Sequence, residues 1–87
     1  MKIYKFEKKG CGPCRMAGMM IEKSAKKYGV EVVSFDVVEN PDLLAQYEIK
    51  TVPSVLVMSD SGDEILHRLT NFGAISNGLE QILRTGR

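Results

Sequence analysis

The sequence predicts an α/β fold in which a four-stranded mixed β-sheet is flanked by helices. Three observations support this prediction: strand-forming and helix-forming segments alternate, a helical segment separates the first two strands, and a turn joins the last two. Strands linked by a crossover helix pair in parallel, whereas a hairpin pairs them antiparallel. With 87 residues, the chain is expected to form a single domain, residues 1–87.

The first half of the chain predicts a strand, a helix and a second strand. Residues 2–6 are rich in strand-forming side chains. Between residues 13 and 28, apolar side chains recur at three- and four-residue spacing, which is typical of a helix, and Gly29 should end it. The β-branched run at residues 30–38 predicts a buried strand.

The second half predicts a short helix, a hairpin and a final helix. Asn40 followed by Pro41 is typical of a helix start. The expected segments are a helix over residues 41–47, strands over 54–58 and 64–70, a loop at 71–73 and a helix over 76–83. The resulting order is β-α-β-(α)-β-β-α.

Composition and charge narrow the range of functions. The chain has 44% hydrophobic and 26% charged residues and a formal net charge of +1, with acids and bases interleaved. Without a basic patch, nucleic-acid binding has no electrostatic support. No apolar run approaches the roughly 20 residues of a membrane-spanning helix, and the first residues do not resemble a signal peptide. We therefore expect a cytoplasmic monomer that binds neither nucleic acid nor membrane.

Cys11 and Cys14 are the candidate catalytic residues, and they fall where the first strand gives way to the helix. The unsatisfied N–H groups and partial positive charge of a helix N-terminus stabilise a thiolate. Cys11 precedes the helix and should be the exposed nucleophile. Cys14 lies on the buried face one turn later and should resolve the mixed disulfide, which leaves a Cys11–Cys14 redox disulfide.

Metal binding and a purely structural role are the alternatives for this pair. Two cysteines can form half of a structural zinc site, but such a site needs four ligands. The chain has no second pair, and His67 is its only histidine. A bridge closing so short a ring would stabilise the fold little. We therefore predict no metal and no cofactor. The alternatives are a zinc site shared by the cysteine pairs of two chains in a dimer, which would be unusual, and two incidental buried cysteines.

The motif Cys11-Gly12-Pro13-Cys14 resembles the active-site motif of the thioredoxin family, beside a strand–helix–strand pattern. Residues 39–41 and residues 47–53, Tyr-Glu-Ile-Lys-Thr-Val-Pro, are similar to the stretch that leads to the family's cis-proline. Gly73 resembles the glycine before the last helix. The resemblance covers nearly the whole chain, but the extra N-terminal strand and helix of full-length thioredoxins are missing. It implies a thioredoxin-like fold.

The resemblance also implies a substrate-binding rim. Pro53 should be cis and face the cysteines, and Val52 should offer its backbone N–H and C=O to an extended substrate segment. Gly12 should let a partner's backbone come close. The residues expected to contact substrate are Gly10, Gly12, Pro13, Val52, Pro53 and Gly73, with Phe72 either on this rim or in the core.

Three departures from the family pattern stand out. Gly10 replaces the tryptophan that precedes the first cysteine of thioredoxins. Lys5 stands where the family has a buried acid, so Lys5 or Glu7 is a candidate for tuning proton transfer at Cys14, the alternative being a solvated charge at a strand end. Residues 70–75 do not match the glutathione motif of glutaredoxins.

The resemblance implies a protein-disulfide reductase that donates electrons in cell redox homeostasis. Its partners would be disulfide-containing proteins, with ribonucleotide reductase as a client, and an NADPH-dependent thioredoxin reductase. Two alternatives stay open at this point: a glutaredoxin-like, glutathione-dependent carrier, and a non-catalytic module that binds partners through the same surface.

Overall fold

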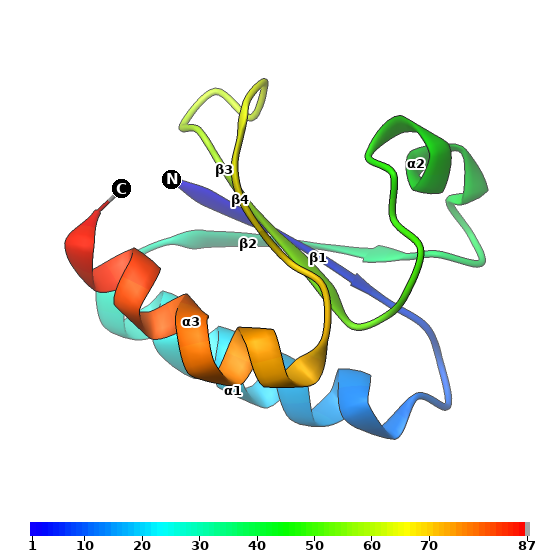
Figure 1. Ribbon diagram of the computed structural model, residues 1–87, viewed down its shortest axis with the longest axis horizontal. Coiled ribbons are helices and arrows are strands. Elements are labelled where there is room, and N and C mark those ends of the chain that lie inside the picture. Colours follow the sequence, from blue (N-terminus) through cyan, green and yellow to red (C-terminus); the bar gives the residue numbers. More distant parts are fainter. Residues whose placement is uncertain (87) are drawn as a thin grey trace.

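The computed structural model describes residues 1–86, which form one four-stranded sheet and three helices (Figure 1). In chain order the elements are β1 (Lys2–Glu7), α1 (Gly12–Tyr28), β2 (Glu31–Asp36), α2 (Pro41–Gln46), β3 (Ser54–Met58), β4 (Ile65–Leu69) and α3 (Phe72–Thr85). The strand order is β2-β1-β3-β4, with β1 and β2 parallel and the other neighbours antiparallel. The predicted mixed sheet and element order are confirmed.

The two faces of the sheet are covered by different helices. Figure 1 shows α1 and α3 on one face and α2 on the other. Because side chains alternate along a strand, Ile3 packs with the helices of the first face, whereas Phe6 packs on the face of α2. The first core is built of aliphatic side chains, namely Ile3, Ala17, Ile21, Ala25, Val55, Val57, Ile75, Leu79 and Leu83.

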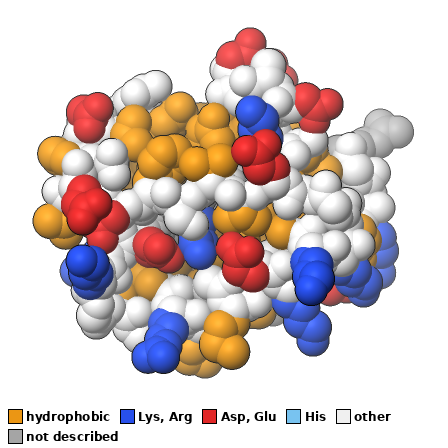
Figure 2. Space-filling view, turned by 180° about the vertical axis from the view of Figure 1, so that it is seen from behind, with side chains coloured by type: hydrophobic (Ala, Val, Ile, Leu, Met, Phe, Trp, Pro, Cys, Tyr) orange, Lys and Arg blue, Asp and Glu red, His pale blue; other side chains and the backbone are white. Residues whose placement is uncertain are grey.

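The face of α2 carries an aromatic core. The ring of Phe6 stacks on Phe35 at 5.3 Å, and Tyr4 meets Phe35 and Tyr47 edge to face. Seen from behind, hydrophobic side chains gather on the surface between α2 and the β3–β4 hairpin loop (Figure 2). This core attaches α2 and the segment that leads to β3, and thereby fixes the position of residues 49–52 near the start of α1.

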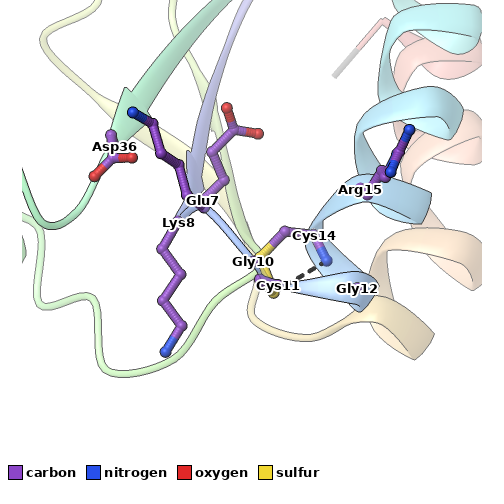
Figure 3. A pocket seen from close by; sticks show the side chains of 9 residues that line it. Glu7, Lys8, Gly10, Cys11, Gly12, Cys14, Arg15 and Asp36 are labelled. Atoms are coloured by element: carbon purple, nitrogen blue, oxygen red, sulfur yellow. Dashed lines mark hydrogen bonds between the residues drawn. A yellow bond between two sulfur atoms is a disulfide. The ribbon is translucent and has the colours of Figure 1, made fainter.

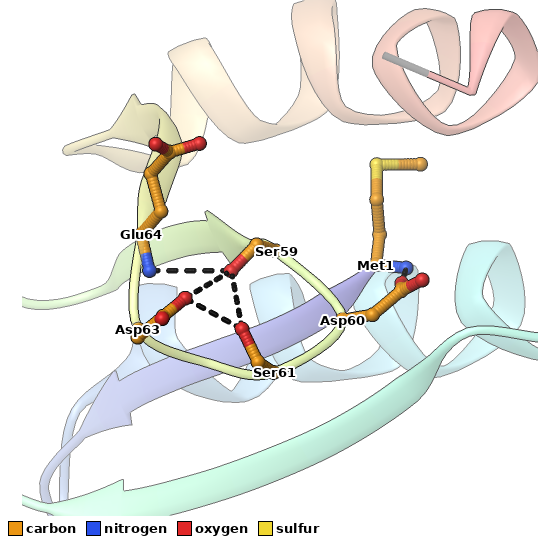
Figure 4. Close-up of polar contacts among 6 residues, drawn as sticks. All are labelled: Met1, Ser59, Asp60, Ser61, Asp63 and Glu64. Atoms are coloured by element: carbon orange, nitrogen blue, oxygen red, sulfur yellow. Dashed lines mark hydrogen bonds and ion pairs between the residues drawn. The ribbon is translucent and has the colours of Figure 1, made fainter.

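The hairpin loop between β3 and β4 is closed by polar contacts (Figure 4). The Asp63 carboxylate accepts hydrogen bonds from the hydroxyls of Ser61 at 2.5 Å and Ser59 at 3.0 Å, and these bonds hold its pKa below the ordinary value. At the tip, the amino group of Met1 pairs with Asp60 and lowers the pKa of that carboxyl group through a hydrogen bond and through its positive charge. The loop thus anchors the N-terminus beside β3.

Strand β2 differs from the prediction of a buried strand. It forms an edge of the sheet, and each of its residues is half-buried or exposed. It also ends at Asp36, because the Asp36 carboxylate accepts the backbone N–H of Val38 at 2.8 Å and turns the chain toward α2. β-branched residues favour strands in general, so composition alone did not separate this edge strand from the central β1 and β3.

Helix α3 begins earlier than predicted. The expected loop at residues 71–73 is wrong, because the Asn71 side chain accepts the N–H of Ala74 at 2.7 Å and caps a helix that starts at Phe72. The other boundaries, those of β2 included, agree with the expected ones to within two residues. Within residues 1–86, none of the helices combines the length and apolarity that a bilayer crossing requires.

Candidate active site

The two cysteines lie at the start of α1 and are joined by a disulfide (Figure 3). Cys11 is the N-cap of the helix, and its Sγ accepts the backbone N–H of Cys14 at 3.2 Å. The Cα atoms are 5.2 Å apart, a separation that suits a disulfide. Cys14 is only 4% exposed, whereas Cys11 is half-buried. The pair is therefore asymmetric, with Cys11 the more accessible sulfur.

The positive end of the α1 dipole lies at Cys11 and is not neutralised by a nearby acidic side chain of the first turn. The first turn of α1 contains no acidic residue, and Pro13 contributes no N–H group. The N–H group of Cys14, which bonds to the Cys11 sulfur, and the positive end of the helix dipole favour a thiolate over a thiol once the disulfide is reduced. The sulfur itself takes the place of the oxygen that usually caps a helix.

Two grooves open on either side of Cys11. The Asp36 groove, with a volume of about 530 Å³, lies between the β1–α1 loop and the end of β2, and it is lined by Glu7, Asp36 and both cysteines among others. The Val52 groove, of about 320 Å³, lies between Cys11 and residues 49–52. Lys8 and Cys11 line both grooves. A substrate disulfide therefore has open access to Cys11 from two sides.

The structure brings most of the expected rim residues to Cys11. Gly10 and Gly12 line the Asp36 groove, and a side chain at either position would meet open space. Val52 lines the Val52 groove. The peptide bond between Val52 and Pro53 is cis, which confirms that expectation from the resemblance. Pro13 is exposed in the first turn of α1, whereas Pro53 is buried.

The start of α3 lies apart from these grooves. Gly73 and Phe72 occupy the first turn of that helix, and neither is among the described residues that line the Asp36 or the Val52 groove. Phe72 instead lines a separate apolar depression with Met16, Met19 and others on α1. Its position is thus between helices, at the edge of the first core, where it is half-buried.

Lys5 is buried beneath α1, at 9% exposure, rather than solvated at a strand end. Its ammonium lies 3.5 Å from the Glu7 carboxylate and 3.8 Å from that of Glu22. It also sits under Gly18, where a Cβ would come within 3.5 Å of the lysine nitrogen. Since Gly18 follows Cys14 by one helical turn, the charged group lies under the part of α1 that carries the buried sulfur.

Sequence reasoning missed the cations around Cys11. Lys8, Lys9 and Arg15 line the Asp36 groove, and Lys50 lines the Val52 groove. The net charge of +1 gives no sign of this cluster, because the four cations come from three separate segments that meet only in the folded chain. Among residues 1–86, no group of three or more His, Cys, Asp or Glu side chains is placed to hold a metal ion.

The fold and the helix-start disulfide define the class of thioredoxin-fold proteins with a redox-active cysteine pair. The family model for thioredoxin matches residues 2–83. The chain therefore belongs to the thioredoxin family.

Individual relatives agree with this assignment. The chain is 34% identical over 62 residues to a thioredoxin of Staphylococcus epidermidis, a match that covers 69% of this chain and 60% of the relative. It is 26% identical over 84 residues to a thioredoxin-like protein derived from the SPbeta prophage of Bacillus subtilis, covering 97% and 96% of the two chains. Thioredoxin 1 of Thermosipho africanus superimposes with a TM-score of 0.74 at 27% identity, over 93% and 97%. The first-named match thus spans less than two thirds of a thioredoxin.

Proposed function

We propose that this protein is a thiol-disulfide oxidoreductase that reduces disulfides in protein substrates. The observation that carries the proposal is the asymmetric Cys11–Cys14 disulfide, with one accessible sulfur at a helix N-terminus and one buried sulfur a turn deeper. Membership of the thioredoxin family supports the same reaction.

The reaction begins with the reduced pair. The Cys11 thiolate attacks one sulfur of a substrate disulfide, and the other substrate sulfur leaves with the electron pair and takes up a proton. The product is a mixed disulfide between Cys11 and the substrate. Cys14 then loses its proton and attacks the Cys11 sulfur, which releases the second substrate thiolate and forms the Cys11–Cys14 disulfide. Two electrons have passed from the protein to the substrate.

The substrate segment would lie along the Val52 groove. Val52 lines this groove, and its backbone N–H and C=O would pair with an extended peptide in the manner of an added strand. Gly10 and Gly12 leave open space beside the attacked sulfur, and Pro13 is exposed next to them. Buried Pro53 would set the path of the Val52 backbone, and Gly73, exposed in the first turn of α3, would add to the substrate-binding rim.

The cycle needs a reductant and clients. From family membership we assign an NADPH-dependent thioredoxin reductase as the reductant, disulfide-containing proteins of the cytoplasm as substrates, and ribonucleotide reductase as a client. The protein would act as a monomer and would need no bound cofactor, because the cysteine pair itself stores the two electrons.

Lys5 is assigned a positioning role in the second step. Cys14 must lose a proton before it can attack. The ammonium of Lys5 under α1 favours the resulting negative charge, whereas the Glu7 and Glu22 carboxylates beside it oppose that charge, so removing the cation alone leaves only the opposing groups. Lys5→Met should therefore move the pH dependence of mixed-disulfide resolution to higher pH. An unchanged pH–rate profile for this variant would remove Lys5 from the mechanism.

Insulin-disulfide reduction tests the proposed function. The protein is assayed with NADPH and thioredoxin reductase, and in parallel with glutathione and glutathione reductase. The proposal expects turnover in the first assay and its loss in Cys11→Ser. Turnover with glutathione alone would indicate a glutaredoxin-like carrier. No turnover in either assay, with partner binding retained in Cys11→Ser, would indicate a binding module.

A further inference from the structure

Four exposed cations surround the accessible cysteine. Lys8 stands on the wall shared by the two grooves, Arg15 and Lys9 line the Asp36 groove, and Lys50 lines the Val52 groove. In the part of the chain that the structure describes, none of the four forms an ion pair. Their charges therefore face the space that a substrate would enter.

The carboxylates of the same grooves have partners within the protein. Glu7 turns toward α1, away from Lys8, and lies 3.5 Å from the ammonium of Lys5 (Figure 3). Asp36 accepts the backbone N–H groups of Val38 at 2.8 Å and Glu39 at 3.2 Å. These acids are committed to internal contacts, so the charge offered to a bound segment is mainly positive.

The Val52 groove adds an apolar wall to these charges. Val37, Leu44, Ile49 and Val52 line it together with Lys8 and Lys50. An apolar wall flanked by cations, next to a backbone segment that can pair with an extended chain, suits a peptide with hydrophobic and acidic side chains. It offers little to a basic peptide, because like charges would face each other across the groove.

We propose that this protein prefers protein disulfides whose cysteine is flanked by acidic residues. The inference rests on the proposed function and names its substrate class. Exposed charge pairs act mainly on the rate of encounter and are weakened by salt. The preference should therefore be seen in the rate of attack by Cys11 at low ionic strength and should shrink at high ionic strength.

The test uses three peptides that contain one disulfide and differ only in the residues beside the cysteines, which are Glu, Gln or Lys. Pre-reduced protein is mixed with each peptide, so that no reductase is needed, and the second-order rate constant of reduction is measured. We expect the Glu peptide to react about fivefold faster than the Gln peptide, and the Lys peptide to be slowest. At high salt the three rates should converge.

Charge variants assign the preference to the grooves. The double variant Lys8→Gln, Lys50→Gln should lose most of the ratio between the Glu and Lys peptides. Lys26→Gln is the matched control, because Lys26 is exposed in the last turn of α1, about 20 Å along the helix from Cys11, and should keep the full ratio.

The outcomes separate this inference from the proposed function. Equal rates for all three peptides with the unaltered protein would overturn the inference and leave the function standing. An undiminished ratio in the double variant would overturn the role of Lys8 and Lys50. Oxidised glutathione is run as a fourth substrate, and a preference for it, with no ranking among the peptides, would overturn the choice of a peptide substrate. Failure to reduce any peptide would instead refute the proposed function.

Discussion

The two ends of α1 are built in opposite ways. At the C-terminal end, Gly29 adopts a left-handed conformation with φ of 66°, and its N–H bonds to the carbonyl of Ala25. The ammonium of Lys27 lies 3.6 Å from the Glu80 carboxylate and 5.4 Å from the ring centre of Tyr28. The N-terminal end, in contrast, has a sulfur as its cap and no acidic residue in the first turn.

The difference shows that stability and reactivity draw on the same helix dipole. Lysines at the C-terminal end interact favourably with the negative pole of the helix dipole and stabilise the helix. An acidic residue in the first turn would do the same at the positive pole, but it would also oppose a thiolate on Cys11. The N-terminal end is left without that stabilisation, and the positive pole remains available for chemistry.

The largest effect should come from removing the sulfurs at the N-terminal end. Cys11→Ser should abolish disulfide reduction, because a serine hydroxyl does not form a disulfide. Cys14→Ser should attack once and then stop as a covalent adduct with the substrate, which mass spectrometry detects. A Cys11→Ser protein that still reduces insulin, or a Cys14→Ser protein that turns over at the normal rate, would contradict the assigned roles.

At the C-terminal end, Gly29→Ala should lower stability and leave the chemistry intact. An alanine at φ of 66° places its Cβ against the following carbonyl, which costs about 1–2 kcal/mol. Chemical denaturation measures this loss, and the pKa of Cys11 should stay the same. A shift of that pKa in Gly29→Ala would show that the two ends of the helix are not independent.

Arg15→Glu tests the competition between stability and reactivity at one position. An acid in the first turn should stabilise the helix by about 0.3–1 kcal/mol through the dipole. The same charge should raise the pKa of Cys11 by about half a unit, since one unit corresponds to about 1.4 kcal/mol. Thermal unfolding and thiol titration measure the two effects, with Arg15→Gln as the control for loss of the cation. An unchanged pKa in Arg15→Glu would contradict the account.

The smallest effect is expected for the ion pair that joins α1 to α3. Lys27→Gln removes the contact with Glu80. It should lower the free energy of unfolding by about a few tenths of a kcal/mol, which is the usual contribution of an exposed ion pair. Lys26→Gln removes a neighbouring charge that forms no ion pair within residues 1–86 and serves as the reference. A loss as large as that of Gly29→Ala would show that the pair does more than a surface contact.

Local signals explain which parts of the structure could be predicted from the sequence. The helix start at Cys11 and its end at Gly29 follow from short motifs, and so the two sulfurs were placed correctly. The edge position of β2 could not be predicted, because β-branched residues suit central and edge strands alike. The sequence left open whether Lys5 is buried near the cysteines or solvated, since its partner Glu22 lies on another element.

The cations around Cys11 illustrate the same limit. Lys8, Arg15 and Lys50 come from the β1–α1 loop, from α1 and from the segment before β3, and only the folded chain brings them to one site. The early start of α3 is different, because Asn71 is a typical helix cap that predicts this start, whereas Gly73 two residues later is typical of a loop.

The pKa of Cys11 in the reduced Cys14→Ser variant is the most direct test of the central claim, which is that the N-terminal end of α1 holds this sulfur ionised. Ultraviolet absorbance of the thiolate follows the titration of the single remaining thiol. The account predicts a pKa clearly below that of free cysteine, about 8.5. A value at or above that of free cysteine would contradict it.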